Sequence, residues 1–148
     1  MSAVELFVGL KIPDTTAITT FHTIEKMGYK IGKVKREMYY KFEIDGDAEK
    51  FSKKIGKVDV LVNANKNKFS HVLEKDADAV YVLVSDTDDK CEGLMHVLKE
   101  RLELKEITSM EKGVLWALYI DAADKEKIAK EIASKLLHNE NYQEIKIV

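Results

Sequence analysis

The spacing of apolar residues predicts two β-strands that open two similar stretches of the chain. Apolar side chains occupy every second position from Val4 to Leu10, and residues 80–84 repeat this alternation. A period of two places alternate side chains on the same face of a strand. We therefore expect one strand near the start of the chain and a second just past its midpoint.

A helical pattern follows each of these strands. In the first stretch Asp14 or Thr15 caps the helix and Gly28 ends it. In the second stretch Asp88 or Asp89 takes the capping position. The apolar residues on one face are Ala17, Phe21, Ile24 and Met27 in the first helix, and Leu94, Val97, Leu98 and Leu102 in the second.

A pair of strands comes next in each stretch. We expect residues 30–36 to pair with residues 38–44, and residues 106–111 to pair with residues 113–120. Both pairs then lead into a second helix.

The second helices and a closing strand complete the predicted elements. Asp45 and Asp121 precede these helices, and residues 143–148 form the last strand. Residues 58–62 have the local pattern of a strand, but the alignment of the two stretches makes them the end of a helix. We follow the alignment, because tertiary context overrides local propensity. The helical apolar residues are Phe51 and Ile55 in one stretch, and Ile128, Ile132 and Leu136 in the other.

The two stretches align with each other at an offset that takes Ala3 to Ala79 and Leu61 to Leu137, which we call the repeat offset. The matching segments are 3–8 with 79–84, 44–51 with 120–128 once Ala123 is skipped, and 61–65 with 137–141. The last match repeats the string Leu-x-Asn-x-Asn. Three matches in the same order favour an internal duplication over chance.

These elements predict an α+β protein made of two tandem ferredoxin-like units, each with the order βαββαβ. The units are residues 1–76 and residues 77–148. Residues 114–120 are apolar on both faces of their strand, so both faces of the sheet need cover. Because a unit of about 70 residues is marginal alone, we expect the two units to pack as an intramolecular pseudo-dimer that covers the second sheet face, or to pack on another subunit.

Composition argues against several classes of function. The net charge is −2 and the pI is near 6.1, and the only arginines are Arg36 and Arg101, which disfavours a nucleic-acid partner. The single cysteine, Cys91, excludes an internal disulfide and a CxxC pair. No apolar run approaches the roughly 18 residues of a membrane span, and no basic leader opens the chain, so we expect a cytoplasmic protein without a membrane partner.

Candidate catalytic and metal-binding residues are few. The histidines lack metal-binding spacing and the glycines form no nucleotide-binding motif, so we predict no catalytic residue and no cofactor held by this chain. The acidic turn at residues 86–89 can hold Mg²⁺ or a cationic group of a partner, or it can simply be a loop with a helix cap. The absence of an EF-type glycine and distal glutamate favours the loop. Trp116 and Tyr119 fit a core or an interface better than a base-stacking sheet.

Several turn and packing patterns of the second stretch occur together in one known family. They are the opening strand, the acidic turn with Gly93, Leu98 and Leu102 on the helix, Lys112-Gly113-Val114, the helix end at 133–139 and the final strand at 142–145. On these residues the second stretch resembles the small PurS subunit of phosphoribosylformylglycinamidine synthase. The first stretch is similar through residues 24–29, 34–40 and 61–63.

The resemblance implies a non-catalytic subunit of a purine-synthesis ligase. Such a complex hydrolyses glutamine on one subunit, passes ammonia to another, and amidates formylglycinamide ribonucleotide with ATP and Mg²⁺. The implied partners are the glutaminase subunit and the large synthetase subunit, with a homo-oligomer as a further option. The candidate partner-facing residues are Asp86, Asp88, Asp89, Gly113, Trp116, Asn63, Asn65, Asn139 and Asn141.

Two departures from the family pattern are visible. Family members are usually single units of about half this length that associate in pairs, whereas this chain joins two copies. The first copy also has Asp14-Thr15-Thr16-Ala17 in place of the acidic turn with glycine. The joined form looks more like the N-terminal region of the large single-chain version of the same synthase.

A different class of function is also open. Paired ferredoxin-like units can hold amino acids or nucleotides at a shared interface, as in ACT-like regulatory modules. The repeated asparagines, Asn63 and Asn65 with Asn139 and Asn141, are candidates for such ligand contacts. Their alternative role is a helix C-cap and turn, which we favour.

Overall fold

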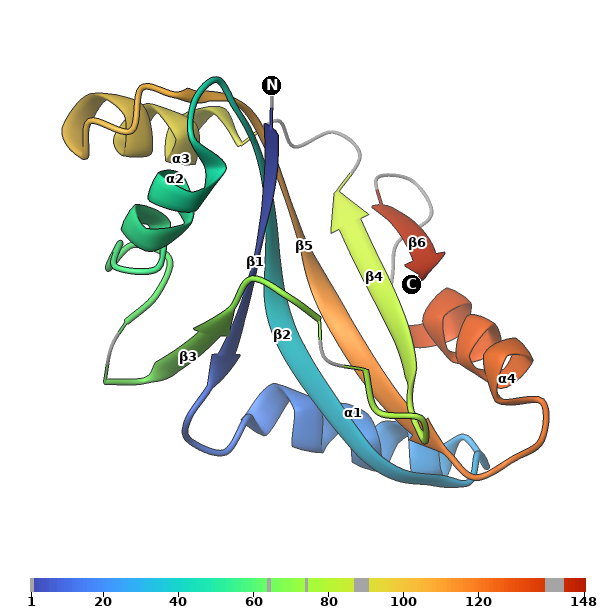
Figure 1. The fold of residues 1–148 in the computed structure, drawn as a ribbon. Helices are drawn as coiled ribbons and strands as arrows, with labels where there is room; N and C mark the ends of the chain where they lie inside the picture. The colour runs from blue at the N-terminus through green and yellow to red at the C-terminus, as the bar shows by residue number, and fades with distance from the viewer. Residues whose placement is uncertain (1, 64, 74, 87–90, 138–142) are drawn as a thin grey trace.

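The computed structural model describes residues 2–63, 65–73, 75–86, 91–137 and 143–148. Within these ranges the chain is an α+β protein with a six-stranded antiparallel sheet in the order β3-β1-β2-β5-β4-β6 and four helices (Figure 1). The elements are β1 (Ser2–Leu10), α1 (Thr15–Lys26), β2 (Ile31–Ile44), α2 (Ala48–Ile55), β3 (Asn67–Ser70), β4 (Val80–Asp86), α3 (Glu92–His96), β5 (Ile107–Ile120), α4 (Lys125–Ile132) and β6 (Gln143–Ile147). Single π-helical turns, Val97–Arg101 and Ala133–Leu137, extend α3 and α4. The predicted fold class, α+β, is confirmed.

The strand registers repeat at the offset found in the sequence. Val4 of β1 faces Phe42 of β2, and Val80 of β4 faces Leu118 of β5. The repeat offset takes both members of the first pair onto the members of the second. The registers of β1 with β3 and of β4 with β6 are related in the same way.

The two longest strands join the halves of the chain. β2 and β5 have 14 residues each and pair with each other along almost their whole length. Met38 faces Val114 near the centre of this pairing, and the repeat offset takes one of these two residues onto the other. The sheet is therefore related to itself, in strand order and register, by an approximate two-fold axis near this pair.

The predicted strand pairs are wrong, because Ile31–Ile44 and Ile107–Ile120 form one long strand each. A tight hairpin needs residues that accept a positive φ, usually glycine or asparagine. Glu37 and Lys112 occupy the expected turns, and neither has a positive φ. Gly113 stays within the strand, where a Cβ would lie 2.6 Å from the carbonyl oxygen of Val84. This glycine allows close strand approach rather than a turn.

All four helices cover one face of the sheet, over two apolar clusters. The first cluster joins α2 and the α3 region to β1, the end of β2 and the start of β5. The second joins α1 and α4 to β4, the start of β2 and the end of β5. Figure 1 shows α2 beside α3 at one end of the sheet, with α1 and α4 toward the other. Neither cluster is confined to residues 1–76 or to residues 77–148.

Local signals account for most of the helix boundaries. Asp14 caps α1, since its Oδ1 accepts hydrogen bonds from the backbone of Thr16 and Ala17 at 3.0 and 3.1 Å. Asp47 caps α2 in the same way. Residues 58–62 form turns rather than a strand or a helix end. The closing strand of the first half is the short β3, which the sequence did not predict, and the expected caps Asp88 and Asp89 lie outside the described residues.

The opposite face of the sheet is covered by the described parts of the connection between β3 and β4, residues 71–73 and 75–79, which we call the strap. Figure 1 shows it crossing β1, β2 and β5 on its way to β4. Beneath it lies a third apolar cluster, with Leu73 of the strap packed against it. Its buried members are Phe7, Tyr39, Tyr81, Leu115 and Ala117.

The prediction that the second sheet face needs cover is confirmed. Face-to-face packing of the two units, one of the two predicted sources of that cover, is wrong, because both units belong to one sheet. Packing on another subunit stays a prediction. The halves meet edge to edge through β2 and β5, so the strap takes this role within the described part of the chain.

Replacing Gly113 by alanine is expected to destabilise the protein by about 1–3 kcal/mol, because the new methyl group would meet backbone rather than a flexible side chain. Gly93 of α3 is the matched control, since nothing lies within 4 Å of the position that a Cβ would take there. Gly93→Ala is expected to be neutral or stabilising by up to about 1 kcal/mol, because alanine favours helix. Urea unfolding measures both, and equal effects of the two substitutions would contradict the close β4–β5 approach.

Candidate functional site

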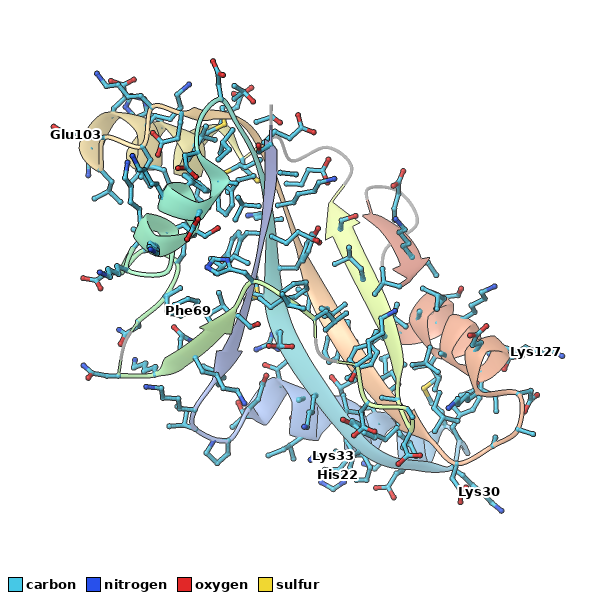
Figure 2. The ribbon with its side chains drawn as sticks, viewed as in Figure 1. His22, Lys30, Lys33, Phe69, Glu103 and Lys127 are labelled. Carbon is cyan, nitrogen blue, oxygen red and sulfur yellow. The ribbon has the colours of Figure 1, made fainter. Side chains whose placement is uncertain are left out.

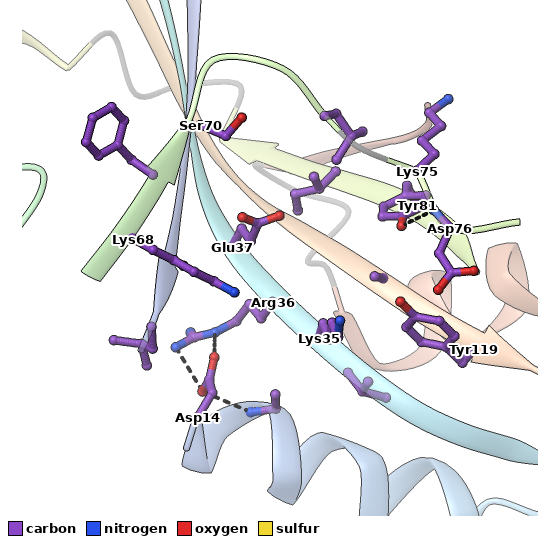
Figure 3. A pocket seen from close by; sticks show the side chains of 18 of the residues that line it. Asp14, Lys35, Arg36, Glu37, Lys68, Ser70, Lys75, Asp76, Tyr81 and Tyr119 are labelled. Atoms are coloured by element: carbon purple, nitrogen blue, oxygen red, sulfur yellow. Dashed lines mark hydrogen bonds and ion pairs between the residues drawn. The ribbon is translucent and has the colours of Figure 1, made fainter. Parts of the chain in front are cut away.

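A hollow of about 950 Å³ opens beside the strap where β1 ends and α1 begins. The pairing of β1 with β2 stops at Val8 and Met38, so the adjoining part of β2 has no β1 neighbour and its side chains border open space. Figure 3 shows Asp14, Arg36 and Lys68 at one end of the hollow, and Lys75, Asp76, Tyr81 and Tyr119 at the other. We call it the strap hollow; its polar lining is Asp14, Lys35, Arg36, Glu37, Lys68, Ser70, Lys75, Asp76, Tyr81 and Tyr119.

An ion pair fixes one end of the strap hollow. Arg36 Nε lies 3.0 Å from Asp14 Oδ2, and its Nη2 lies 3.3 Å from Oδ1. The same carboxylate caps α1, so it accepts hydrogen bonds from two sides. Both charged groups are largely shielded from solvent, and the pair holds the start of α1 against β2.

Glu37 and Lys68 approach each other across Gly9 in the middle of the hollow. A Cβ at Gly9 would lie 3.4 Å from Lys68 Cε and 3.5 Å from Glu37 Oε2, so glycine leaves room for both side chains. Burial raises the pKa of Glu37, and the charges of Lys68 and Lys35 oppose that rise. The lysines thus favour the ionised carboxylate at this position.

A tyrosine pair fixes the other end of the hollow. The backbone N–H of Asp76 donates a hydrogen bond of 2.7 Å to the hydroxyl oxygen of Tyr81. Burial, followed by the influence of Tyr81 and Asp76, raises the pKa of Tyr119 to about 12. The Nζ atoms of Lys33 and Lys35 each lie 5.8 Å from the centre of the Tyr119 ring. These contacts tie the strap to β4 and β5.

A second hollow, of about 770 Å³, lies on the other side of the strap over β1, β2 and the end of β6. Here the Tyr39 hydroxyl donates a 2.7 Å hydrogen bond to Glu5 Oε2. Burial raises the pKa of Tyr39 above its ordinary range, and the hydrogen bond and negative charge of Glu5 raise it further. The phenol therefore stays neutral well above the pH at which a free tyrosine ionises.

His71 anchors the start of the strap. Its Nδ1 lies 2.9 Å from the carbonyl oxygen of Glu5, and its Nε2 lies 3.1 Å from that of Ser52. Both partners are acceptors, and which ring nitrogen donates depends on the tautomer. The side chain links the strap to β1 and to α2.

The predicted site residues fall in several places and do not form one site. Gly113 and Trp116 are buried within the sheet, and Trp116 Nε1 has no hydrogen-bond partner among the described residues. Asp86 ends β4, and nothing is described of its side chain. Asp88, Asp89, Asn139 and Asn141 lie outside the described residues. None of the described candidates lines the strap hollow.

The first pair of asparagines forms a local turn. Asn63 Oδ1 accepts a hydrogen bond from the backbone of Asn65 at 2.9 Å, and Asn67 Oδ1 accepts one from the backbone of Asn63 at the same distance. These bonds close the loop before β3. The helix C-cap that we expected here is not formed, because α2 ends at Ile55. The side-chain N–H of Asn67 donates a hydrogen bond to the carbonyl oxygen of Gly9.

Sequence reasoning missed the residues of the strap hollow, which come from several separate elements. The available signals were weak: Gly9 in an otherwise regular strand, and Asp14 as a helix cap. The lysine at position 68 was visible only as part of a short basic run. Only the long-range path of the strap brings these groups together.

Groups of three or more metal-binding side chains are absent from the described ranges. No helix in these ranges is long and apolar enough to cross a membrane. A scan against models of known protein families found no match, and a search of curated proteins found no similar sequence.

Alkaline titration tests the two raised tyrosine pKa values. Because these pKa values are higher in the folded protein than the ordinary 10.0, their stabilisation is complete below about pH 10 and is lost as the pH rises further. We expect Tyr39→Phe and Tyr119→Phe each to flatten the fall in unfolding free energy between about pH 9 and pH 11.5. Urea unfolding at several pH values measures this slope. A wild-type slope in both variants would contradict the assigned environments.

Proposed function

We propose that this chain is a tandem form of the PurS subunit of phosphoribosylformylglycinamidine synthase, acting as a non-catalytic bridge between glutaminase and synthetase subunits. The observation that carries the proposal is the repeat of strand register, in which the Val4–Phe42 pair recurs as Val80–Leu118. A shared register at the same offset as the sequence matches supports two copies of one unit. Two of the PurS-like patterns recur at this offset: residues 34–40 correspond to the stretch around residues 112–114, and residues 61–63 correspond to the end of residues 133–139.

The apolar clusters support two ferredoxin-like units that exchange elements. The first cluster lies over β1 and the neighbouring ends of β2 and β5, with two helices above them, and β3 extends the sheet beside β1. Four strands and two helices are the content of one βαββαβ unit. In this interpretation each long strand serves both units, so the first unit takes one of its four strands, β5, and one helix, α3, from residues 77–148.

The proposed role is to join two other subunits of a cytoplasmic complex. In it the glutaminase releases ammonia from glutamine, and the synthetase uses ATP and Mg²⁺ to amidate formylglycinamide ribonucleotide. A bridge needs a rigid body and accessible surfaces. The exchanged cores supply the rigid body, because neither half can be displaced without separating β2 from β5. The helix-free face and the strap hollow supply the surface.

Reconstitution tests the proposal. We expect synthetase and glutaminase to form product from glutamine only when this chain is added, while synthesis from ammonium by the synthetase alone does not need it. Rates of product formation with each nitrogen source measure the difference. Full glutamine-dependent activity without this chain would overturn the proposal, and the ammonium reaction controls for an inactive synthetase.

A further inference from the structure

Exposed apolar side chains gather around the strap hollow. Of the seven large apolar residues exposed in the described chain, three have side chains that border it. They come from two directions: Ile12 and Ile18 from the entry to α1 and its first turn, and Val72 from the strap. The side chain of Phe69 in β3 lies on the helix side of the sheet, against Gly56. A concentration of exposed apolar groups at one polar hollow is typical of an interaction surface.

The charged groups of the hollow leave hydrogen-bond donors to spare. Asp14 is paired with Arg36, and Asp76 Oδ1 accepts from the backbone of Asp78 at 3.2 Å. Lys35, Lys68 and Lys75, in contrast, form no ion pair within 4.0 Å among the described residues, although the charges of Lys68 and Lys35 act on the nearby Glu37. Each ammonium group carries three donors and no acceptor. The hollow therefore has unused hydrogen-bond donors that carry positive charge, and a carboxylate of a partner would complement them.

We propose that the strap hollow is the docking site for an acidic, amphipathic segment of one partner subunit. This inference rests on the proposed function, and it assigns the surface and the chemistry of contact. Apolar side chains of the segment lie against Ile12, Ile18 and Val72, and its carboxylates meet Lys68 and Lys75. Desolvated apolar contact supplies most of the affinity, and the lysines set orientation and association rate.

A second copy of this chain fits the hollow less well. In a two-fold contact the same surface of each copy faces the other. The lysines of one hollow would therefore face the lysines of the other. Its carboxylates cannot relieve this repulsion, because they already accept hydrogen bonds or lie close to lysines within their own chain. A small free anion would satisfy the lysines but leave the apolar rim uncovered.

Two pairs of matched variants test the docking site. Val72→Glu and Lys75→Glu change the hollow, while Val60→Glu and Lys127→Glu make the same changes elsewhere. Val72 and Val60 are comparable, with 69% and 55% of their surface exposed, and Lys127 points away from α4 into solvent (Figure 2). The dissociation constant of the full chain with each purified subunit is measured by calorimetry at low and high salt. Thermal melting of every variant verifies that it is folded.

We expect both hollow variants to bind at least one subunit about tenfold more weakly than the wild type, with the loss for Lys75→Glu shrinking at high salt. Both control variants are expected to stay within about twofold of the wild type. Wild-type affinity in the hollow variants overturns the docking site and leaves the bridging role intact. A wild-type chain that binds neither subunit overturns both proposals. Loss of self-association alone, measured by sedimentation, overturns the docking site in favour of a second copy.

Discussion

The pairing of β2 with β5 is the constraint on which the rest of the structure depends. Two strands of 14 residues run antiparallel past a central pair, Met38 and Val114. The end of β2 pairs with β1 of its own half, whereas the start of β2 packs with β4 and α4 of the other half. The apolar side chains at the two ends of β2 consequently belong to different clusters. Neither half can bury its own apolar residues without the other, and the chain folds around one shared sheet.

The same constraint explains why the second face of the sheet is covered as it is. With the halves joined edge to edge, their helix-free faces are continuous and cannot cover each other. The chain must also travel from the edge strand β3 to β4, and the direct route crosses this face. The strap buries an apolar cluster on the way and is fastened by His71 at one end and by Tyr81 at the other. The strap hollow forms because β1 stops pairing with β2 at Val8 and Met38, which leaves the adjoining part of β2 open beside the strap.

Local patterns predicted the elements whose causes are local. The opening strand has a clean alternation, Asp14 caps α1 as its position indicates, and Ile24 and Phe51 are buried on the helix faces assigned to them. The repeat offset was also visible in the sequence, and the strand registers have the same offset. These features depend on period and capping, which are properties of short segments.

Features that depend on distant partners were not predicted. Whether residues 31–44 fold back as a hairpin or run straight is decided by a competing strand in the other half of the chain, and alternation is identical in both cases. The strand β3 and the strap have little periodicity of their own. The strap hollow follows from both, so its lysines and tyrosines carried no shared signal in the sequence. The sequence patterns instead pointed to Trp116 and Gly113. Both residues serve packing, since Trp116 is buried in the second cluster and Gly113 allows the close approach of β4.

The most direct test of the account is a nuclear magnetic resonance measurement of cross-strand contacts along β2. The exchanged arrangement predicts nuclear Overhauser effects between the backbone of Val34 and that of Leu118, continuing residue by residue through the Met38–Val114 pair. A hairpin turning at Glu37 would instead bring Val34 next to Tyr40. Contacts of that second kind, with none between β2 and β5, would contradict the shared sheet and the exchanged cores built on it.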